Sequence, residues 1–370
     1  MEFLSKIKIY DKYIFKQVVA STLGAVFLFT VIWIAPEMLL NVIRSVMAGE
    51  YSVKTGILVI AYELPNILGK GLPVGLLLGS LFTFDKLSKD SELTIFRATG
   101  LSFKRIVAPV LVFSVLITAF CFLMYDQLIP YSSNKLSEIK KENWYSQYIY
   151  TQKDDSGKPK QTIISTFNKD EIINIIVLDF SDKKFKDLHA LSKIYTAKRA
   201  IVKSDRWQLN DVVAYEITEN GIFEKINYKK SINILSGKSA QNAYKLMMYS
   251  EKRDREITNA DLLSYLMLLK REHLEEEHNL MLNKFYQRFA HPCVCILLAI
   301  MGCLLGFSKP REQRVIGFTI AIGAIFLYYI TLPFFDLLAE KGVLPPFITA
   351  LASPVFFMAC IYWFYKSKDL

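Results

Sequence analysis

Six long apolar stretches constrain this chain more than any other feature of its sequence. A helix needs about 20 apolar residues to cross the hydrocarbon core of a bilayer. The chain is 52% hydrophobic and yet 22% charged, which indicates that apolar and charged residues are segregated along it. We predict six membrane-spanning helices, near Val18–Val42, Ile57–Phe84, Ile106–Leu128, Phe289–Phe307, Val315–Leu338 and Val343–Tyr365.

The polar middle of the chain has a different period. Residues 213–218 and 222–228 alternate between apolar and polar side chains, and residues 172–180 and 193–202 are rich in strand-forming types. Short strands of this kind predict an all-β sandwich or roll. From Asn259 the pattern becomes helical again. We therefore expect an α-helical integral membrane protein with an inserted all-β domain. Its three parts are an N-terminal membrane half (1–128), the β domain (129–258), and a connecting helix with a C-terminal membrane half (259–370).

The net charge of +10 lies largely beside the apolar stretches, which favours membrane topology and anionic lipid headgroups over nucleic acid. Basic residues gather at alternate connections, so the positive-inside rule places both termini in the cytoplasm and residues 129–284 outside. The first apolar stretch is too long for a signal peptide and no cleavage site follows it. The basic residues on the cytoplasmic side are Lys6, Lys8, Lys12, Lys16, Lys86, Lys89, Arg97, Lys104, Arg105, Lys309, Arg311, Arg314, Lys366 and Lys368.

No pattern for catalysis or metal binding stands out. The five cysteines lie in apolar segments without paired CxxC spacing, so they are expected to act as small hydrophobic residues. His273 and His278, five residues apart, would lie about 140° apart around a helix, so a solvated helix face is expected there. The chain also has no GxxxxGK[ST] motif, so energy from ATP would have to come from another chain.

A short charged segment follows the second apolar stretch. Asp90 or Ser91 can cap the start of a helix, and Gly100 suits its C′ position. About nine residues cannot hold a helix alone in water, so this helix must dock. Leu93 and Phe96, with Ile95 beside them, form its apolar edge. The residues alone leave open whether it docks on a partner, on lipid or on its own bundle.

Four charged residues fall within or beside the apolar stretches: Glu37, Glu63, Lys70 and Asp336. Such residues face headgroups, a protein interior or a water-filled path. Solvation at headgroup level and a substrate or proton path both fit them.

Motifs spread over nearly the whole chain resemble the lipopolysaccharide-export permeases of the LptF/LptG type. They are Asp11-Lys12-Tyr13-Ile14, Leu72-Pro73 with Leu77-Leu78-Gly79, Leu87-Ser88, Ser91-Glu92-Leu93, Arg97-Ala98, Gly100-Leu101-Ser102, Ala197-Lys198-Arg199-Ala200, Trp207-Gln208-Leu209, Arg288-Phe289-Ala290 with Pro292, and Gly342-Val343 with Pro345-Pro346. The last span is somewhat more similar to the LptG branch.

The resemblance implies a non-catalytic subunit that extracts lipopolysaccharide from the outer leaflet of the inner membrane. It would pair with an identical or paralogous permease on a dimeric cytoplasmic ABC ATPase, which binds the ATP and Mg²⁺, and this chain would bind no cofactor of its own. Lipid would enter between spans one and five and pass to a β-jellyroll domain. Similar rolls of a periplasmic bridge, and a single-span membrane partner, would follow. The residues implied in coupling to the ATPase are Ser91, Glu92, Leu93, Ile95, Phe96, Arg97 and Gly100, and we expect Leu93→Asp or Glu92→Lys to uncouple it.

The substrate path is expected to use the β domain and a few charged residues. Family members often carry a basic residue in the first span, whereas Glu37 stands at the corresponding place here, which leaves Arg44 and Lys70 as basic candidates for lipid phosphate. An open roll could hold acyl chains between inward apolar side chains, and a closed core is the alternative. The candidates for that lining are Ile175, Val177, Tyr215 and Ile217.

Two other functions fit the same residues. A permease of similar build could move another lipid or a lipoprotein. A structural membrane protein could use its β domain only to scaffold an envelope bridge. A membrane enzyme is disfavoured because no catalytic constellation is apparent in the sequence.

Overall fold

The computed structural model describes residues 8–34, 38–140, 146–153, 159–168, 171–185, 188–203, 206–217, 223–250, 252–307 and 315–367. Within them, six helices are long and apolar enough to cross a membrane, which confirms the predicted number of spans. They are α2 (Ile9–Ile34), α4 (Val53–Lys89), α6 (Phe103–Leu123, continued through the π-turn η1, Met124–Leu128, into α7, Ile129–Lys140), α10 (Glu275–Gly306), α11 (Val315–Glu340) and α12 (Pro346–Ser367).

Two helices lie where the sequence predicted the first span near Val18–Val42. Helix α2 ends at Ile34 and α3 (Met38–Met47) follows, with residues 35–37 outside the described residues. The face of α3 that carries Val42 and Val46 packs over Gly56 of α4.

Helix α4 is the centre of the membrane bundle, because two glycine pairs allow its backbone to approach its neighbours. Gly75 and Gly79 lie four residues apart on its face toward α2. A Cβ atom on Gly79 would lie 2.6 Å from the Thr22 Cα atom, and one on Gly75 would lie 2.2 Å from a Val26 methyl group. No real Cβ contact is so short, so the two helices touch through backbone that only glycine leaves accessible.

Helix α10 also packs closely through glycine residues, against the other side of α4. A Cβ atom on Gly302 would lie 2.4 Å from the Leu77 carbonyl oxygen, and one on Gly306 would lie 2.5 Å from the Leu81 carbonyl oxygen. The Ser88 hydroxyl also donates a hydrogen bond to the Gly306 carbonyl at 3.2 Å. Helix α4 is thus held by close backbone contact on two sides.

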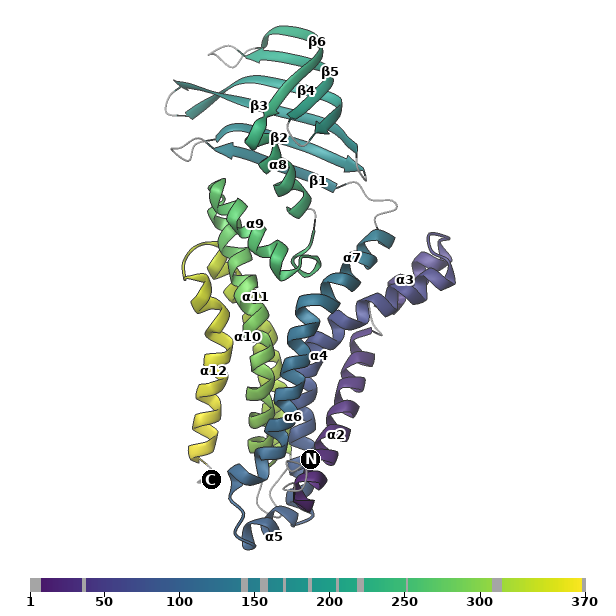
Figure 1. Cartoon of the computed structure of the whole chain (residues 1–370), viewed down its shortest axis with the longest axis vertical. Helices are drawn as coiled ribbons and strands as arrows, with labels where there is room; N and C mark the ends of the chain where they lie inside the picture. The colour runs from purple at the N-terminus through teal and green to yellow at the C-terminus, as the bar shows by residue number, and fades with distance from the viewer. Residues whose placement is uncertain are drawn as a thin grey trace, which may run out of the picture. The chain divides into compact units, whose positions relative to one another are not determined.

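The chain divides into two compact units. The first, residues 1–136 and 279–370, holds the membrane helices. In this unit the start of α2, the end of α12 and the short helix α5 (Glu92–Ala98) lie at the same end of the bundle (Figure 1). The second unit, residues 137–278, holds the inserted sheet, the helices α8 (Gly237–Ser250) and α9 (Asn259–Arg271), and the 3-10 turn η3 (Asp254–Glu256).

The insert is a six-stranded antiparallel sheet, which confirms its all-β character. Each strand pairs with its neighbours in sequence, so the described strands form a meander, whereas a jelly roll in the strict sense has Greek-key connections. The strands are β1 (Ser146–Lys153), β2 (Pro159–Asn168), β3 (Glu171–Phe185), β4 (Leu188–Lys203), β5 (Arg206–Ile217) and β6 (Phe223–Ser236).

A line of irregular residues crosses the sheet. Asn174 of β3 and Asp211 of β5 both have positive φ, and the register places both opposite Lys198 of β4. The register of β2 shifts at the same level, around Ser165. Asn and Asp tolerate this backbone conformation better than other non-glycine residues. In β5 the left-handed Asp211 changes which residues face the same side. Trp207 and Leu209 are buried before this residue, and Val212 and Ala214 are buried after it.

Helix α8 covers one face of the sheet. The Trp207 indole N–H donates a hydrogen bond to the Ala240 carbonyl at 3.2 Å, and both residues are buried. Ala243 and Leu246 of α8 are buried as well. Figure 1 shows α8 lying along one side of the sheet. This covered face is the closed core of the inserted unit.

We expect Gly79→Leu to lower the stability of the membrane bundle by at least about 2 kcal/mol, because the new side chain overlaps the backbone of Thr22. The thermal unfolding midpoint of the purified chain in detergent measures this loss. Gly24→Leu on α2 is the matched control, since nothing lies within 4 Å of a Cβ atom there. Equal midpoints for the two variants would contradict the close approach of α2 and α4.

Candidate functional site

Helix α5 is short and ends in a well-defined C-terminal cap. Gly100 has φ +86°, and its N–H donates to the Arg97 carbonyl at 2.9 Å. The Leu101 N–H donates to the Phe96 carbonyl at 3.2 Å. These two hydrogen bonds form a Schellman motif, which satisfies carbonyls at the helix end and requires the left-handed conformation that glycine adopts without strain. The predicted stop at Gly100 is confirmed.

The start of α5 differs from its prediction. Ser91 occupies the N-cap position, but its side chain makes no capping hydrogen bond and its φ is +60°. Asp90 is the C-cap residue of α4. The chain changes direction between the two helices within these two residues, and Ser91 is in the left-handed conformation at this turn. In this conformation the Ser91 side chain does not cap the helix.

The inner face of α5 is buried in its own bundle. Leu93 is only 3% exposed and shares a hydrophobic core with Ile14, Phe103 and Ile106. Phe96 packs against the same core. Leu93 was predicted among the coupling residues, and its burial places it in the core that holds α5; its role in coupling and the uncoupling effect of Leu93→Asp stay predictions. On the outer face, Ile95 is 59% exposed, with Thr94 and Thr99 exposed beside it.

Contacts at its two ends join α5 to other helices. The Tyr13 hydroxyl of α2 donates a hydrogen bond to Glu92 Oε1 at 2.8 Å. The second carboxylate oxygen, Oε2, is buried and accepts no hydrogen bond from any residue that the structure describes. At the other end, the Arg97 guanidinium lies over the Phe307 ring at 5.6 Å, just past the end of α10. Sequence reasoning missed the role of Tyr13, although it lies in one of the family motifs.

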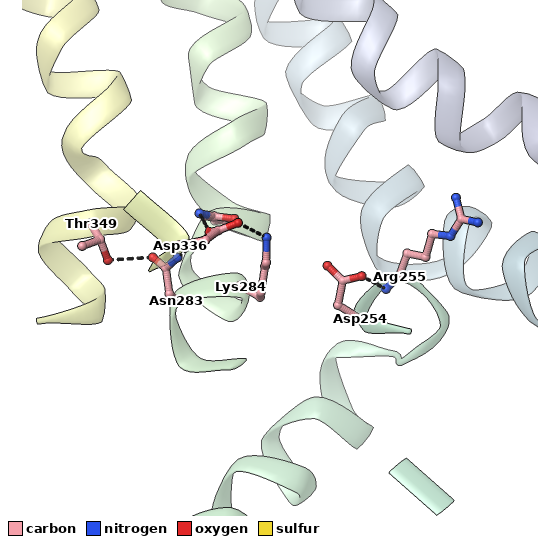
Figure 2. A network of polar contacts seen from close by, with 7 residues as sticks. Asp254, Arg255, Asn283, Lys284, Asp336 and Thr349 are labelled. Carbon is pink, nitrogen blue, oxygen red and sulfur yellow. Dashed lines mark hydrogen bonds and ion pairs between the residues drawn. The ribbon is translucent and has the colours of Figure 1, made fainter. Parts of the chain in front are cut away.

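A buried polar cluster joins the three C-terminal helices (Figure 2). Asp336 of α11 accepts hydrogen bonds from Asn283 at 2.8 Å and Gln287 at 2.7 Å, and it forms an ion pair with Lys284, all three on α10. Thr349 of α12 donates to Asn283 Oδ1 at 2.8 Å. The charge of Asp336 is thus satisfied inside the protein, which is one of the environments that membrane charges require.

The predicted phosphate-binding candidates are separated along the chain. Glu37 lies outside the described residues. Arg44 lies in the last turn of α3. Lys70 lies within α4, where its ammonium is 5.7 Å from the centre of the Trp33 ring. The Lys70 carbonyl also accepts a hydrogen bond from the Tyr329 hydroxyl at 2.6 Å, which joins α11 to α4.

The four predicted lining residues of the β domain do not share one face. Ile175 and Val177 are buried on the face that α8 covers. The register pairs Val177 with Tyr195, and Tyr195 with Ala214, so Ala214 lies on the same covered face. Tyr215 follows Ala214 directly and therefore lies on the opposite face of the sheet, together with Ile217. Strand alternation therefore divides the four candidates between the two faces of the sheet, and their role in lining a lipid path stays a prediction.

The uncovered face of the sheet carries a row of side chains, apolar except for Thr196, that crosses all six strands. Cross-strand pairs join its members in order: Ile149, Ile164, Ile176, Thr196, Val213 and Tyr228. Tyr228 is 83% exposed and Ile149 is 66% exposed. A second row beside it joins Leu178, Ile194, Tyr215 and Ile226. The inserted unit therefore has one closed face and one open apolar face.

The acidic stretch that precedes α10 has structural partners. Glu272 accepts hydrogen bonds from the Tyr150 hydroxyl at 2.9 Å and from Asn242 at 2.7 Å, which ties β1 and α8 to the end of α9. Burial, and then the nearby Glu272 carboxylate, raise the pKa of Tyr150. The Glu277 carboxylate accepts from Tyr265 at 2.6 Å. Among the described residues, no group of three or more His, Cys, Asp or Glu could hold a metal ion.

Six spanning helices, an inserted antiparallel sheet and a short helix between the second and third spans define a multi-pass membrane protein. Residues 12–367 match the model of the family described as Lipopolysaccharide export system permease LptF/LptG. Because the match covers nearly the whole chain, this chain belongs to that family of lipopolysaccharide-export permeases, which are non-catalytic transmembrane subunits. The match covers both branches, LptF and LptG. No curated protein matches the chain.

We expect Asp336→Leu to destabilise the bundle by about 2 kcal/mol, because it leaves the Lys284 ammonium and two amide donors without their acceptor. The double variant Asp336→Leu with Lys284→Met should unfold at a higher temperature than Asp336→Leu alone, since it also removes the unpaired charge. Thermal unfolding in detergent tests both variants. A double variant no more stable than the single would show that the ion pair is not the source of the loss.

Proposed function

We propose that a cytoplasmic ABC ATPase docks on the outer face of α5 and drives lipopolysaccharide export through this permease. The observation that carries the proposal is the two-sided character of α5, which anchors Leu93 in its own bundle and leaves Ile95 exposed. A short helix fixed on one side can transmit force applied on the other.

We place α5 and both chain termini on the cytoplasmic side of the inner membrane. The ends of α2, α4, α6 and α12 that meet near α5 carry basic residues, and few acidic ones, which is the charge bias of cytoplasmic connections. The inserted sheet would then be periplasmic. The described residues that support this orientation are Lys8, Lys12, Lys16, Lys86, Lys89, Lys104, Arg105 and Lys366; Lys6, Lys309, Arg311, Arg314 and Lys368 lie outside the described residues.

The family relationship supports the remaining partners. The permease would pair with an identical or paralogous subunit on an ATPase dimer that binds ATP and Mg²⁺, while this chain binds no cofactor. It would pass lipopolysaccharide from the outer leaflet of the inner membrane to a periplasmic bridge of β-jellyroll proteins, with a single-span membrane partner. The character of its last span favours the LptG branch.

We further propose that acyl chains rest on the open apolar face of the sheet. On the covered face, Trp207 and the buried side chains of α8 pack together, so lipid would compete there with that helix. The open face presents a row of aliphatic and aromatic side chains to solvent, and burying such a surface against lipid is favourable. Of the predicted lining residues, only Tyr215 and Ile217 would belong to this path.

Ile95→Asp should abolish association with the ATPase and lipopolysaccharide-stimulated ATP hydrolysis, because it places a charge at the centre of the docking face without disturbing the core. Co-purification and hydrolysis by the reconstituted complex measure the two effects. Leu263→Asp, a similar change at an exposed position of α9, is the matched control. Normal association and normal stimulation of Ile95→Asp would refute docking on α5.

A photoreactive benzoylphenylalanine at Tyr228 should form an adduct with lipopolysaccharide during ATP-driven export. The same group at Lys229, also exposed, should form little, because adjacent residues of a strand point to opposite faces. Antibody detection of adducts on gels measures the difference. Adducts of equal strength at both positions would contradict binding on the open face.

A further inference from the structure

We propose that Asp11, Tyr13, Arg105 and Glu92 form a latch that ties α5 to the first membrane helix, so that α2 moves whenever α5 moves. The inference rests on the proposed docking of the ATPase on α5 and deepens it. The chain itself connects α5 only to α4 and α6. Motion of α5 could reach α2 only through contacts made across space, and the latch provides polar contacts of this kind.

The first contact of the latch is between Tyr13 and Glu92. The two residues are 79 positions apart in sequence, and the tyrosine hydroxyl donates to the carboxylate at 2.8 Å. Hydrogen bonds to an ionised acceptor are among the stronger ones in proteins. One turn away, the rings of Tyr10 and Phe96 lie 6.2 Å apart, which adds an aromatic contact between the same two helices.

The second contact fixes the start of α2 to the start of α6. Arg105 donates a hydrogen bond to Asp11 Oδ2 at 2.7 Å, and the Asp11 side chain is only 12% exposed. The same oxygen accepts from the Lys8 N–H at 3.2 Å, so it also caps the first turn of α2. The Arg105 guanidinium lies over the Tyr10 ring at 5.4 Å. Arg105 thereby holds both polar and aromatic groups of α2 in place beside α5.

The latch surrounds the inner face of α5 and leaves its outer face untouched. Leu93 shares its core with Ile14, which follows Tyr13 directly. Ile95, on the outer face, makes no part of the latch and stays accessible for docking. Loss of the latch should therefore spare association with the ATPase and impair only the transfer of motion. Asp11, Tyr13 and Arg105 are positioning residues in this proposal.

A charge exchange tests the latch in the complex with the ATPase. Asp11→Arg and Arg105→Asp alone, and Tyr13→Phe, should keep the ATPase bound and lower lipopolysaccharide-stimulated hydrolysis by about fivefold or more. The double variant Asp11→Arg with Arg105→Asp should regain most of the stimulation, because it restores an opposite-charge pair. Unchanged stimulation in the single variants, or no recovery in the double variant, would overturn the latch.

A distance measurement separates this proposal from the docking proposal. Spin labels on Leu23→Cys of α2 and on Ser102→Cys, just after α5, in a chain with Cys293 and Cys360 replaced by serine, report the spacing of α2 and the end of α5. With ATP added, the distance should stay constant in the latched chain and change in the chain that carries Tyr13→Phe. A change of equal size in both chains would overturn the latch even where Ile95→Asp has confirmed docking. Loss of the ATPase from the latch variants would overturn it as well.

Discussion

Close backbone contact between α4 and its two neighbours supports every other arrangement in the membrane unit. Lipid tails are as apolar as leucine side chains, so helices in a membrane gain little from hydrophobicity alone and depend on close packing. Gly75 and Gly79 let α2 approach, and Gly302 and Gly306 let α10 approach. The position of α5 follows from this contact, since α5 directly follows α4 in the chain and packs on the start of α2.

Polar contacts join the membrane helices near their ends. The Asp336 cluster joins α10, α11 and α12 near one end of α11. The latch residues join α2, α5 and α6 at the end of the bundle that carries α5. An ion pair adds little stability on an exposed surface, but a partly buried one with extra hydrogen bonds defines which helices meet. Both clusters thus set the register of the bundle more than its overall stability.

The inserted unit is a sheet with apolar side chains on both faces, and a single helix can cover only one of them. Helix α8 closes the face that carries Trp207 and Leu209. Asp211, in the left-handed conformation, keeps that face continuous along β5, across a line where simple alternation would fail. The opposite face keeps exposed apolar side chains, among them Ile149 and Tyr228.

The sequence by itself determined the six spans, the inserted strands, the stop at Gly100 and the family. Each depends on local composition or on motifs, which neighbouring residues express without tertiary contacts. Only the tertiary structure decided that Leu93 is buried while Ile95 is exposed, because both lie on the apolar edge of a helix whose neighbours are distant in sequence. The same holds for Tyr215, whose face depends on strand register and on Asp211. The partners Tyr13 and Glu92 could not be foreseen either, since 79 positions separate them and only the packing of α2 on α4 brings them together.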